Sequence, residues 1–234
     1  MYCLSGTAMQ APALGGAGAT LTDAAFAEPP SMEQLYAASA ALHGHVCPGV
    51  VLGTRMASLG MSLLGLAPGV PDEDLTVYVE TARCATDAIQ ATTRATVGRH
   101  TLRVLDFGKM AATFALDGEA VRVVALESSR AAAERLRPEL PAGKVRQTAA
   151  YREMTDTDLF QVSHVRLLEA PRDPHKAPRP KTACPHCADV FEVSKGVHTA
   201  EGLLCASCGG DAYFLPAPTH DRGHGMSAPP SAEG

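Results

Sequence analysis

The order of apolar and polar positions predicts helices in the first part of the chain. Ser31 followed by Gln34 forms a capping box, which opens a helix through Leu42. Pro48 then starts a second helix. Its apolar side chains recur at alternating spacings of four and three residues, at Leu52, Met56, Leu59, Leu63 and Leu66. This spacing predicts one apolar stripe that faces the core.

A second face of the same helix carries small residues. Its members are Gly49, Gly53, Ala57 and Gly60. Small side chains let another helix approach closely, either from the same chain or from a dimer partner. Loose local packing is the alternative interpretation.

The chain after this helix alternates between apolar and polar positions as strands do. We expect strands over 75–80, 101–107 and 161–168, and a helix from Thr81 or Thr86 to about Arg94. Asp117-Gly118 between the apolar runs 112–116 and 120–126 predicts a hairpin, because this dipeptide accepts positive φ. Two further helices are expected over 128–137 and 142–154. Helices mixed with strands and a hairpin indicate an α+β fold.

Composition divides the chain into segments. Nine of the 17 prolines lie after residue 170, and four of them fall in the polar run APRDPHKAPRPK. We therefore expect a flexible Ala/Gly-rich leader, a core domain, a Pro-rich linker, a small C-terminal module and a disordered tail. Their expected bounds are 1–30, 31–169, 170–182, 183–215 and 216–234.

Charge and hydropathy exclude several classes of protein. The chain has 20 Lys and Arg against 25 Asp and Glu, so its net charge of −5 gives no positive field for nucleic acid or anionic lipid. The first basic residue is Arg55, so the N-terminus lacks the charged start of a secretory signal. The apolar window 46–67 carries Arg55, Ser58 and Ser62 on one stripe, which favours a buried helix over a membrane span. We expect a cytoplasmic protein with no nucleic-acid or membrane partner.

Four of the seven cysteines form two CxxC pairs near the C-terminus. Seventeen residues separate the pair Cys184 and Cys187 from the pair Cys205 and Cys208. Two-residue gaps let each knuckle turn both thiolates inward, so the pairs complete a tetrahedral S4 shell. This spacing predicts a structural zinc ribbon. A redox CxxC or two disulfides are the alternatives, and the absence of an export signal counts against them.

The rest of this module adds no ligand to that prediction. The apolar runs 190–193 and 202–204 are expected to form the hairpin that joins the two knuckles. His186 and His198 lie within the module, but four thiolates already complete the shell, so both are expected to be bystanders.

A second group of metal-ligand types lies in the segment HGHVCPG, residues 43–49. His43, His45 and Cys47 alternate, so an extended backbone points all three side chains the same way. Two imidazoles and one thiol suit zinc or another thiophilic transition metal. The alternative is structural: a histidine that caps helix carbonyls and a cysteine that is a small buried residue.

Cys84 and Asp87 favour the metal-site interpretation. Cys47 and Cys84 both fall at the start of a predicted helix, where the helix dipole favours the thiolate that binds metals or attacks electrophiles. Asp87 lies one turn after Cys84. It could bind the metal, orient His43 or His45, or act as a general base, and helix N-terminal charge compensation is the structural alternative.

A third motif, DFGK, follows a predicted strand and ends at Lys109. It places a carboxylate and an ammonium at a strand end, where sites are often built. It is not a P-loop, because the GxxxxGK[ST] frame is absent. The candidate catalytic residues are therefore Cys47, Cys84, Asp87 and Lys109.

Together the segments HGHVCPGVVLGTR, ETARCATDAIQ and DFGK resemble the FmdE family of formylmethanofuran dehydrogenase subunits over roughly 31–214. The resemblance implies helices packed on a mostly antiparallel sheet, then a small zinc-ribbon or treble-clef-like module, often in a homodimer. It also implies a metal-binding cleft. By position, the cleft residues are His43, His45, Cys47, Cys84, Asp87 and Lys109.

We therefore expect a metal-binding accessory protein that handles a transition metal or cofactor for a molybdenum- or tungsten-type oxidoreductase. Its partner would be that oxidoreductase, such as formylmethanofuran dehydrogenase, or a protein of metal-cofactor assembly. The ribbon would hold structural zinc, and the core cleft zinc or another transition metal. The alternatives are a small metalloenzyme with an open Cys/His site, with Asp87 as base and Lys109 stabilising an anion, or a zinc-ribbon regulatory or interaction protein. A redox pair of Cys47 and Cys84 is a further option, and Cys3 has no assignment.

Overall fold

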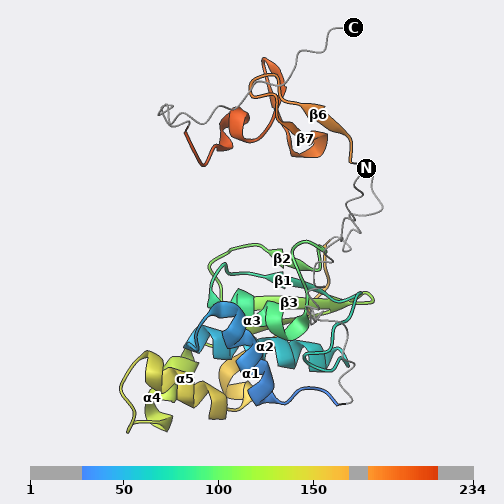
Figure 1. Cartoon of the computed structure of the whole chain (residues 1–234). Helices are drawn as coiled ribbons and strands as arrows, with labels where there is room; N and C mark the ends of the chain where they lie inside the picture. Colours follow the sequence, from blue (N-terminus) through green and yellow to red (C-terminus); the bar gives the residue numbers. More distant parts are fainter. Residues whose placement is uncertain (1–27, 169–178, 216–234) are drawn as a thin grey trace, which may run out of the picture. The chain divides into compact units, whose positions relative to one another are not determined.

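The computed structural model describes residues 28–168 and 179–215 of the chain (Figure 1). The chain divides into two compact units, Met1–Arg172 and Asp173–Gly234. We call them the core unit and the ribbon unit. Cys3, nearly all of the expected leader, much of the expected linker and the expected tail lie outside the described residues. The predicted bounds of these segments stay predictions.

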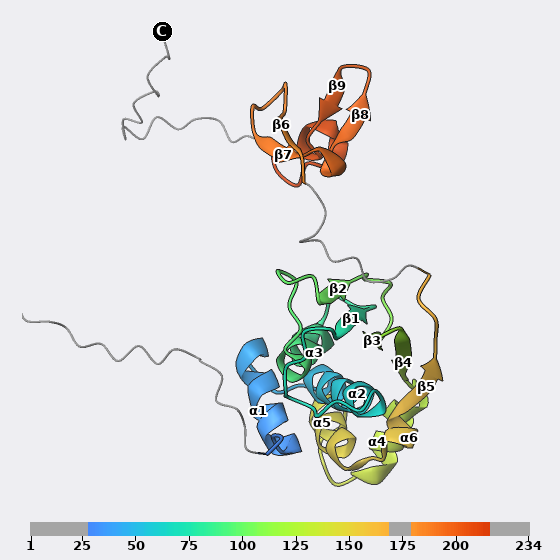
Figure 2. The same cartoon turned by 90° about the vertical axis from the view of Figure 1, so that its right-hand side faces the viewer.

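The core unit is a five-stranded sheet with helices gathered on one side of it (Figures 1 and 2). Its helices are α1 Met32–His43, α2 Pro48–Leu63, α3 Cys84–Thr93, α4 Ser128–Leu136, α5 Lys144–Glu153 and α6 Asp156–Leu159. Its strands are β1 Thr76–Val79, β2 Leu102–Val104, β3 Ala111–Leu116, β4 Glu119–Ala125 and β5 Phe160–His164. The predicted α+β fold is confirmed.

The strand order β2-β1-β3-β4-β5 explains the position of α3. Only the β1–β2 pair is parallel, and the other three pairs of this sheet are antiparallel. A parallel pair needs a crossover connection, and here the crossover contains α3. The N-terminus of α3 therefore lies just beyond the end of β1. β3 and β4 form the predicted hairpin, with Asp117 and Gly118 both at positive φ, 50° and 88°.

Two predicted helix starts have different outcomes. The capping box at the start of α1 is confirmed, since Ser31 and Gln34 each accept a hydrogen bond from the other's backbone N–H. The prediction that Thr81 or Thr86 caps α3 is wrong, because Arg83 holds the cap position without a side-chain bond. The Thr86 hydroxyl instead donates to the Thr81 carbonyl, 2.6 Å away.

Helix α2 is the centre of the core. It contacts α1, α3, α5 and the sheet, so it is buried on more than the one predicted stripe. Val51, Met56 and Met61 have no exposed surface, whereas Leu63 at the end of the helix is 43% exposed. The stripe prediction holds in the middle of the helix and fails at its end, where the chain leaves the core.

The small-residue face of α2 packs against α3 of the same chain. A Cβ added at Gly49 would lie 2.9 Å from the Cys84 Cβ, and one added at Gly53 would lie 2.7 Å from the Ala85 backbone. Atoms this close cannot coexist without movement of the helix. This contact selects the intrachain interpretation for Gly49 and Gly53 and fixes Cys84 against the start of α2.

A buried ion pair holds the loop between β1 and α3. The Arg122 guanidinium on β4 donates two hydrogen bonds to the Glu80 carboxylate, at 2.6 and 2.7 Å. The Glu80 side chain is 10% exposed and that of Arg122 is 29% exposed. These hydrogen bonds, opposed by desolvation, hold the pKa of Glu80 below its usual range.

The DFGK motif fastens the same loop from the other side. The Glu80 carbonyl accepts hydrogen bonds from the backbone N–H groups of Phe107 and Lys109, at 2.9 and 3.0 Å. The Asp106 carboxylate accepts one from the Ala82 N–H at 3.2 Å. The motif therefore secures the loop that leads into Cys84, a role that its sequence did not disclose.

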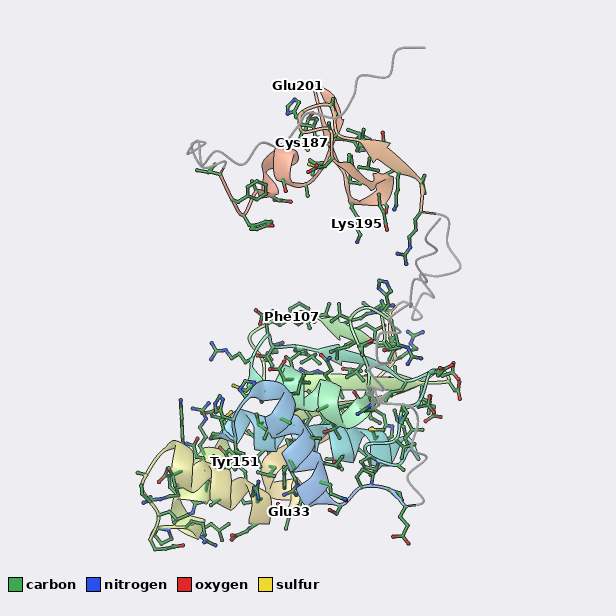
Figure 3. The ribbon with its side chains drawn as sticks, in the orientation of Figure 1. Glu33, Phe107, Tyr151, Cys187, Lys195 and Glu201 are labelled. Atoms are coloured by element: carbon green, nitrogen blue, oxygen red, sulfur yellow. The ribbon has the colours of Figure 1, made fainter. Side chains whose placement is uncertain are left out.

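Arg55 joins α2 to the far helices. Its guanidinium donates to the Tyr151 carbonyl at 3.0 Å, at the end of α5, and to the Asp156 carboxylate at 2.5 Å, at the start of α6. Glu33 and Tyr151 mark this helical side of the unit in Figure 3. Arg55 thus connects the end of one helix to the start of the next.

The ribbon unit contains two short hairpins. β6 Lys181–Ala183 pairs with β7 Val190–Glu192, and β8 Val197–Thr199 pairs with β9 Gly202–Leu204. The predicted pairing of 190–193 with 202–204 is therefore wrong. Each CxxC is attached to a hairpin of its own, since β6 leads into Cys184 and β9 leads into Cys205. β6 also begins inside the segment expected to be linker.

Among the described residues, no helix has the length and apolar character needed to cross a membrane.

Replacing Gly53 with Ala tests the close packing of α2 on α3. The new methyl group meets the backbone of Ala85, which no side-chain rotation can relieve. We expect the free energy of unfolding to fall by about 1–2 kcal/mol, after allowance for the better helix propensity of Ala. Gly98→Ala is the control, because its Cβ meets nothing within 4 Å. Equal stability of the two variants in urea unfolding would contradict the packing described.

Replacing Glu80 with Gln tests the buried ion pair. The lowered pKa of Glu80 means that its stabilisation is fully present above the unfolded pKa of about 4.3. It is lost as the pH falls through the lower folded pKa. We expect Glu80→Gln to unfold about 2 kcal/mol more easily near neutral pH and to match the wild type near pH ~3. Urea unfolding across this range measures the difference.

Glu119→Gln, at an exposed strand position, is the control and should show little difference at either pH. A Glu80→Gln deficit that stays the same from neutral to acid pH would show that charge pairing is not its cause.

Candidate metal centres

The turn between α1 and α2 brings His43, His45 and Cys47 together. One nitrogen from each histidine and the Cys47 sulfur all lie within 4.8 Å of one another. α1 ends at His43 because Gly44 adopts φ 92°, the left-handed conformation that glycine favours, and donates its N–H to Ala40. The chain is extended again at Cys47, which precedes Pro48 at the start of α2. The alternation read from the sequence thus yields a convergent donor set.

Asp87 fixes the orientation of His43. The His43 Nδ1 lies 2.8 Å from the Asp87 Oδ2. An ionised carboxylate only accepts hydrogen bonds, so a neutral His43 carries its proton on Nδ1 and leaves the Nε2 lone pair free. Of the roles considered for Asp87, the geometry selects the one of orienting His43.

The His43 Nε2 is buried and has no hydrogen-bond partner within the described parts of the chain. The His43 side chain as a whole is 15% exposed. Buried polar atoms are nearly always satisfied, so an unpaired one needs an explanation. A lone pair left free by a carboxylate on the other ring nitrogen is the arrangement that histidine ligands of metals adopt.

The other two donors differ in exposure. The His45 ring lies 4.7 Å from the His43 ring, centroid to centroid, and its residue is exposed, whereas Cys47 is 9% exposed. The donor set therefore opens to solvent on the His45 side. Imidazole and thiolate together fit zinc and similar transition metals better than magnesium or calcium, which prefer oxygen ligands.

Cys84 lies against Cys47 but outside the set of three donors. Its side chain packs on the small buried cluster of Cys47, Val50 and Ala88. Burial, followed by the hydrogen bond and charge of Cys47, raises the pKa of the Cys84 thiol. The expectation that the helix start favours its thiolate is therefore wrong for the chain alone, because desolvation outweighs the dipole. A cation beside the two sulfurs would reverse this balance.

Lys109 lies on the DFGK loop and not among the metal-ligand types. It is exposed, and its positive charge lowers the pKa of Glu80. Within the described residues it makes no hydrogen bond or ion pair with the two histidines or with Cys47. Phe107 of the same motif is 63% exposed and marks the end of the sheet in Figure 3. The catalytic role expected of Lys109 stays a prediction.

Sequence reasoning missed the roles of Glu80, Arg122 and Asp106 in holding the loop before Cys84. Two signals were present. Glu80 ends an apolar strand, and Arg122 interrupts another, AVRVVA. A charge within a strand that is otherwise buried needs an opposite charge, so these two side chains could have been paired.

The second centre lies in the ribbon unit. The sulfurs of Cys184, Cys187, Cys205 and Cys208 all lie within 4.8 Å of one another. The Cys187 and Cys205 sulfurs are 3.7 Å apart. Four sulfurs at the usual zinc–sulfur distance form a tetrahedron with edges of about 3.8 Å. The four thiols are thus already spaced for one tetrahedral ion, which is consistent with the predicted zinc ribbon.

Charge in this cluster also favours a bound cation. Backbone amides, chiefly that of Cys205, lower the pKa of Cys184 to about 6. The Cys205 side chain and burial raise the pKa of Cys208 to about 12, because neighbouring thiolates repel one another. A divalent cation removes that repulsion. His186 lies 2.6 Å from Glu201 and not in the cluster, as expected of a bystander; Cys187 and Glu201 are labelled in Figure 3.

Comparisons with known proteins match the core unit to relatives. The chain is 30% identical over 194 residues to a probable S-adenosyl-L-methionine-binding protein of Archaeoglobus fulgidus. The match covers 74% of this chain and 52% of that protein, so the chain spans about half the length of this curated relative. Among solved structures, an FmdE-like protein of tungsten formylmethanofuran dehydrogenase from Syntrophus aciditrophicus is 27% identical. It aligns with a TM-score of 0.60 over 80% of this chain and 96% of that chain.

A family model supplies the assignment. The model described as FmdE, molybdenum formylmethanofuran dehydrogenase operon, matches residues 42–165. This range includes His43, His45, Cys47, Cys84 and the DFGK loop. It covers more than half of the 234 residues. The chain therefore belongs to the FmdE family.

Proposed function

We propose that this chain is a metal-binding accessory protein with two separate metal sites. The core unit would bind zinc or another transition metal through His43, His45 and Cys47. The ribbon unit would hold a structural zinc through its four cysteines. The role would be to handle a metal or cofactor for a molybdenum- or tungsten-type oxidoreductase such as formylmethanofuran dehydrogenase.

The observation that carries the proposal is the buried and unpaired Nε2 of His43. Asp87 holds the other nitrogen of the ring at 2.8 Å, so the free lone pair is fixed in direction. Two further soft or borderline donors lie within 4.8 Å of it. A metal ion would satisfy this nitrogen, which the described residues leave without a partner.

The four thiols of the ribbon differ from this site in the number of ligands. Four protein ligands close a zinc site, so the ribbon supports a structural role. Three ligands leave one position for another group. In the core unit that fourth group is either Cys84, which packs on Cys47, or a ligand from solution.

The three-donor arrangement also supports a second candidate, a small metalloenzyme. His45 is exposed, so an open position at the core site is accessible to a substrate. A bound metal would polarise that substrate. The exposed Lys109 would then stabilise a developing anion, and Asp87 would hold His43 in place. The four-ligand alternative, with Cys84 bound, supports storage or transfer of the metal instead.

The partner of the accessory protein is inferred from the family alone. We propose an oxidoreductase or a protein of metal-cofactor assembly as partner, and a homodimer as the working form. We place the protein in the cytoplasm, where glutathione and thioredoxin keep thiols reduced and able to bind metal.

Elemental analysis after anaerobic purification tests the two sites. We expect two metal ions per wild-type chain, and one in Cys47→Ser and in Cys184→Ser, because each substitution removes a thiolate from a different centre. Cys84→Ser separates the two forms of the core site. Loss of the core metal indicates a closed four-ligand site, and retention indicates an open one.

His186→Ala is the matched control, because His186 lies next to the ribbon cysteines but pairs with Glu201. It should keep both ions. A Cys47→Ser protein that still binds two ions would contradict the core site, whereas a Cys184→Ser protein that does so would contradict only the ribbon site.

A further inference from the structure

A pocket of about 380 Å³ lies between the end of α1 and the second half of α3. It adjoins the core donor set, since Leu42 in its wall precedes His43, and Gln90 lies one helical turn after Asp87. It has no part in the metal sites described above. Its volume falls within the range of small-molecule sites.

The polar lining of this pocket consists of groups that can donate hydrogen bonds. They are Gln90, Arg94, Thr96 and Arg99. Apolar contacts come from Leu42 and Pro71, among others. No carboxylate is among the described residues that line it. Guanidinium groups are always charged and carry five N–H donors in a planar fork that matches an oxyanion. This lining fits an anionic group beside a small apolar body.

Arg94 is the strongest element of the pocket. It ends α3 with φ 62°, in the left-handed conformation that normally selects glycine or asparagine. A long side chain is therefore kept where glycine would be less strained. In the described parts of the chain its guanidinium has no carboxylate partner. Its charge also suits the negative end of the α3 dipole, so a purely structural role has to be separated by experiment.

Arg99 and the nearby acidic loop are compatible with an anion in the pocket. Arg99 pairs with Glu73 at 3.0 Å, but the side chains are 53% and 86% exposed. An exposed pair of this kind is weak and can exchange for a ligand. The Asp72 carboxylate is occupied, because it accepts hydrogen bonds from the N–H groups of Asp74 and Leu75.

A second pocket of about 480 Å³, lined by residues of α1, α2 and α5, shows the contrast. Its arginines are already neutralised, since Arg55 pairs with Asp156 at 2.5 Å and Arg152 with Glu33 at 3.1 Å. Among the residues that the structure describes, it offers no unpaired cation. The pocket beside α3 differs in having one.

We propose that the pocket at Arg94 binds a small anion through a phosphate or carboxylate group. This inference goes beyond the proposed metal-binding function and does not depend on it. Arg94 provides the main charged contact, Arg99 a second one after release of Glu73, and Gln90 and Thr96 add hydrogen bonds.

Isothermal titration calorimetry of the full chain tests this site with two probes, inorganic phosphate and succinate. Binding of one probe in preference to the other identifies the anionic group. We expect Arg94→Ala to weaken binding of the preferred probe at least tenfold, and Arg94→Lys to keep part of it. Arg130→Ala is the control, because Arg130 lies on α4 and pairs with Glu127. It should bind as the wild type does.

Arg94→Gly separates binding from folding. Glycine relieves the left-handed strain, so its melting temperature should equal or exceed that of the wild type while anion binding is lost. Arg94→Gly that binds the probe as tightly as the wild type would overturn the proposal. So would a wild-type chain that binds neither probe.

Discussion

The contact between His43 and Asp87 is the interaction on which the core site depends. It joins the last residue of α1 to the first turn of α3, two segments 44 residues apart. It exists only because α2 lets α3 approach at Gly49 and Gly53, where any side chain would collide. The same contact sets which nitrogen of His43 is free. Packing of three helices thus determines the chemistry of one ring atom.

The two metal centres depend on different levels of structure. In the ribbon unit, short hairpins lead to the cysteines, and local turns place all four sulfurs within 4.8 Å. In the core unit, three donors come from one turn, but their orientation relies on α3. The loop that leads into α3 is in turn held by Glu80, Arg122 and Asp106. A change far from the core donors can therefore alter them, whereas the ribbon is largely self-contained.

The sequence predicted those features that rest on local spacing. The CxxC pairs, the alternation of His43, His45 and Cys47, and the Asp117-Gly118 hairpin all follow from the backbone geometry of a few residues. The role of Asp87 could not be chosen from the sequence, because it depends on how α1 packs on α3. The ribbon pairing failed because strands of three residues carry almost no apolar pattern. The Glu80–Arg122 pair was missed because 42 residues separate its members.

Nitrogen-15 NMR of the histidine rings of the full chain, before and after zinc is added, tests the central claim most directly. The His43 signals can be assigned with His43→Gln. The account predicts that Nδ1 stays protonated throughout and that the Nε2 resonance shifts when zinc binds. A protonated Nε2 that is unaffected by zinc would contradict it.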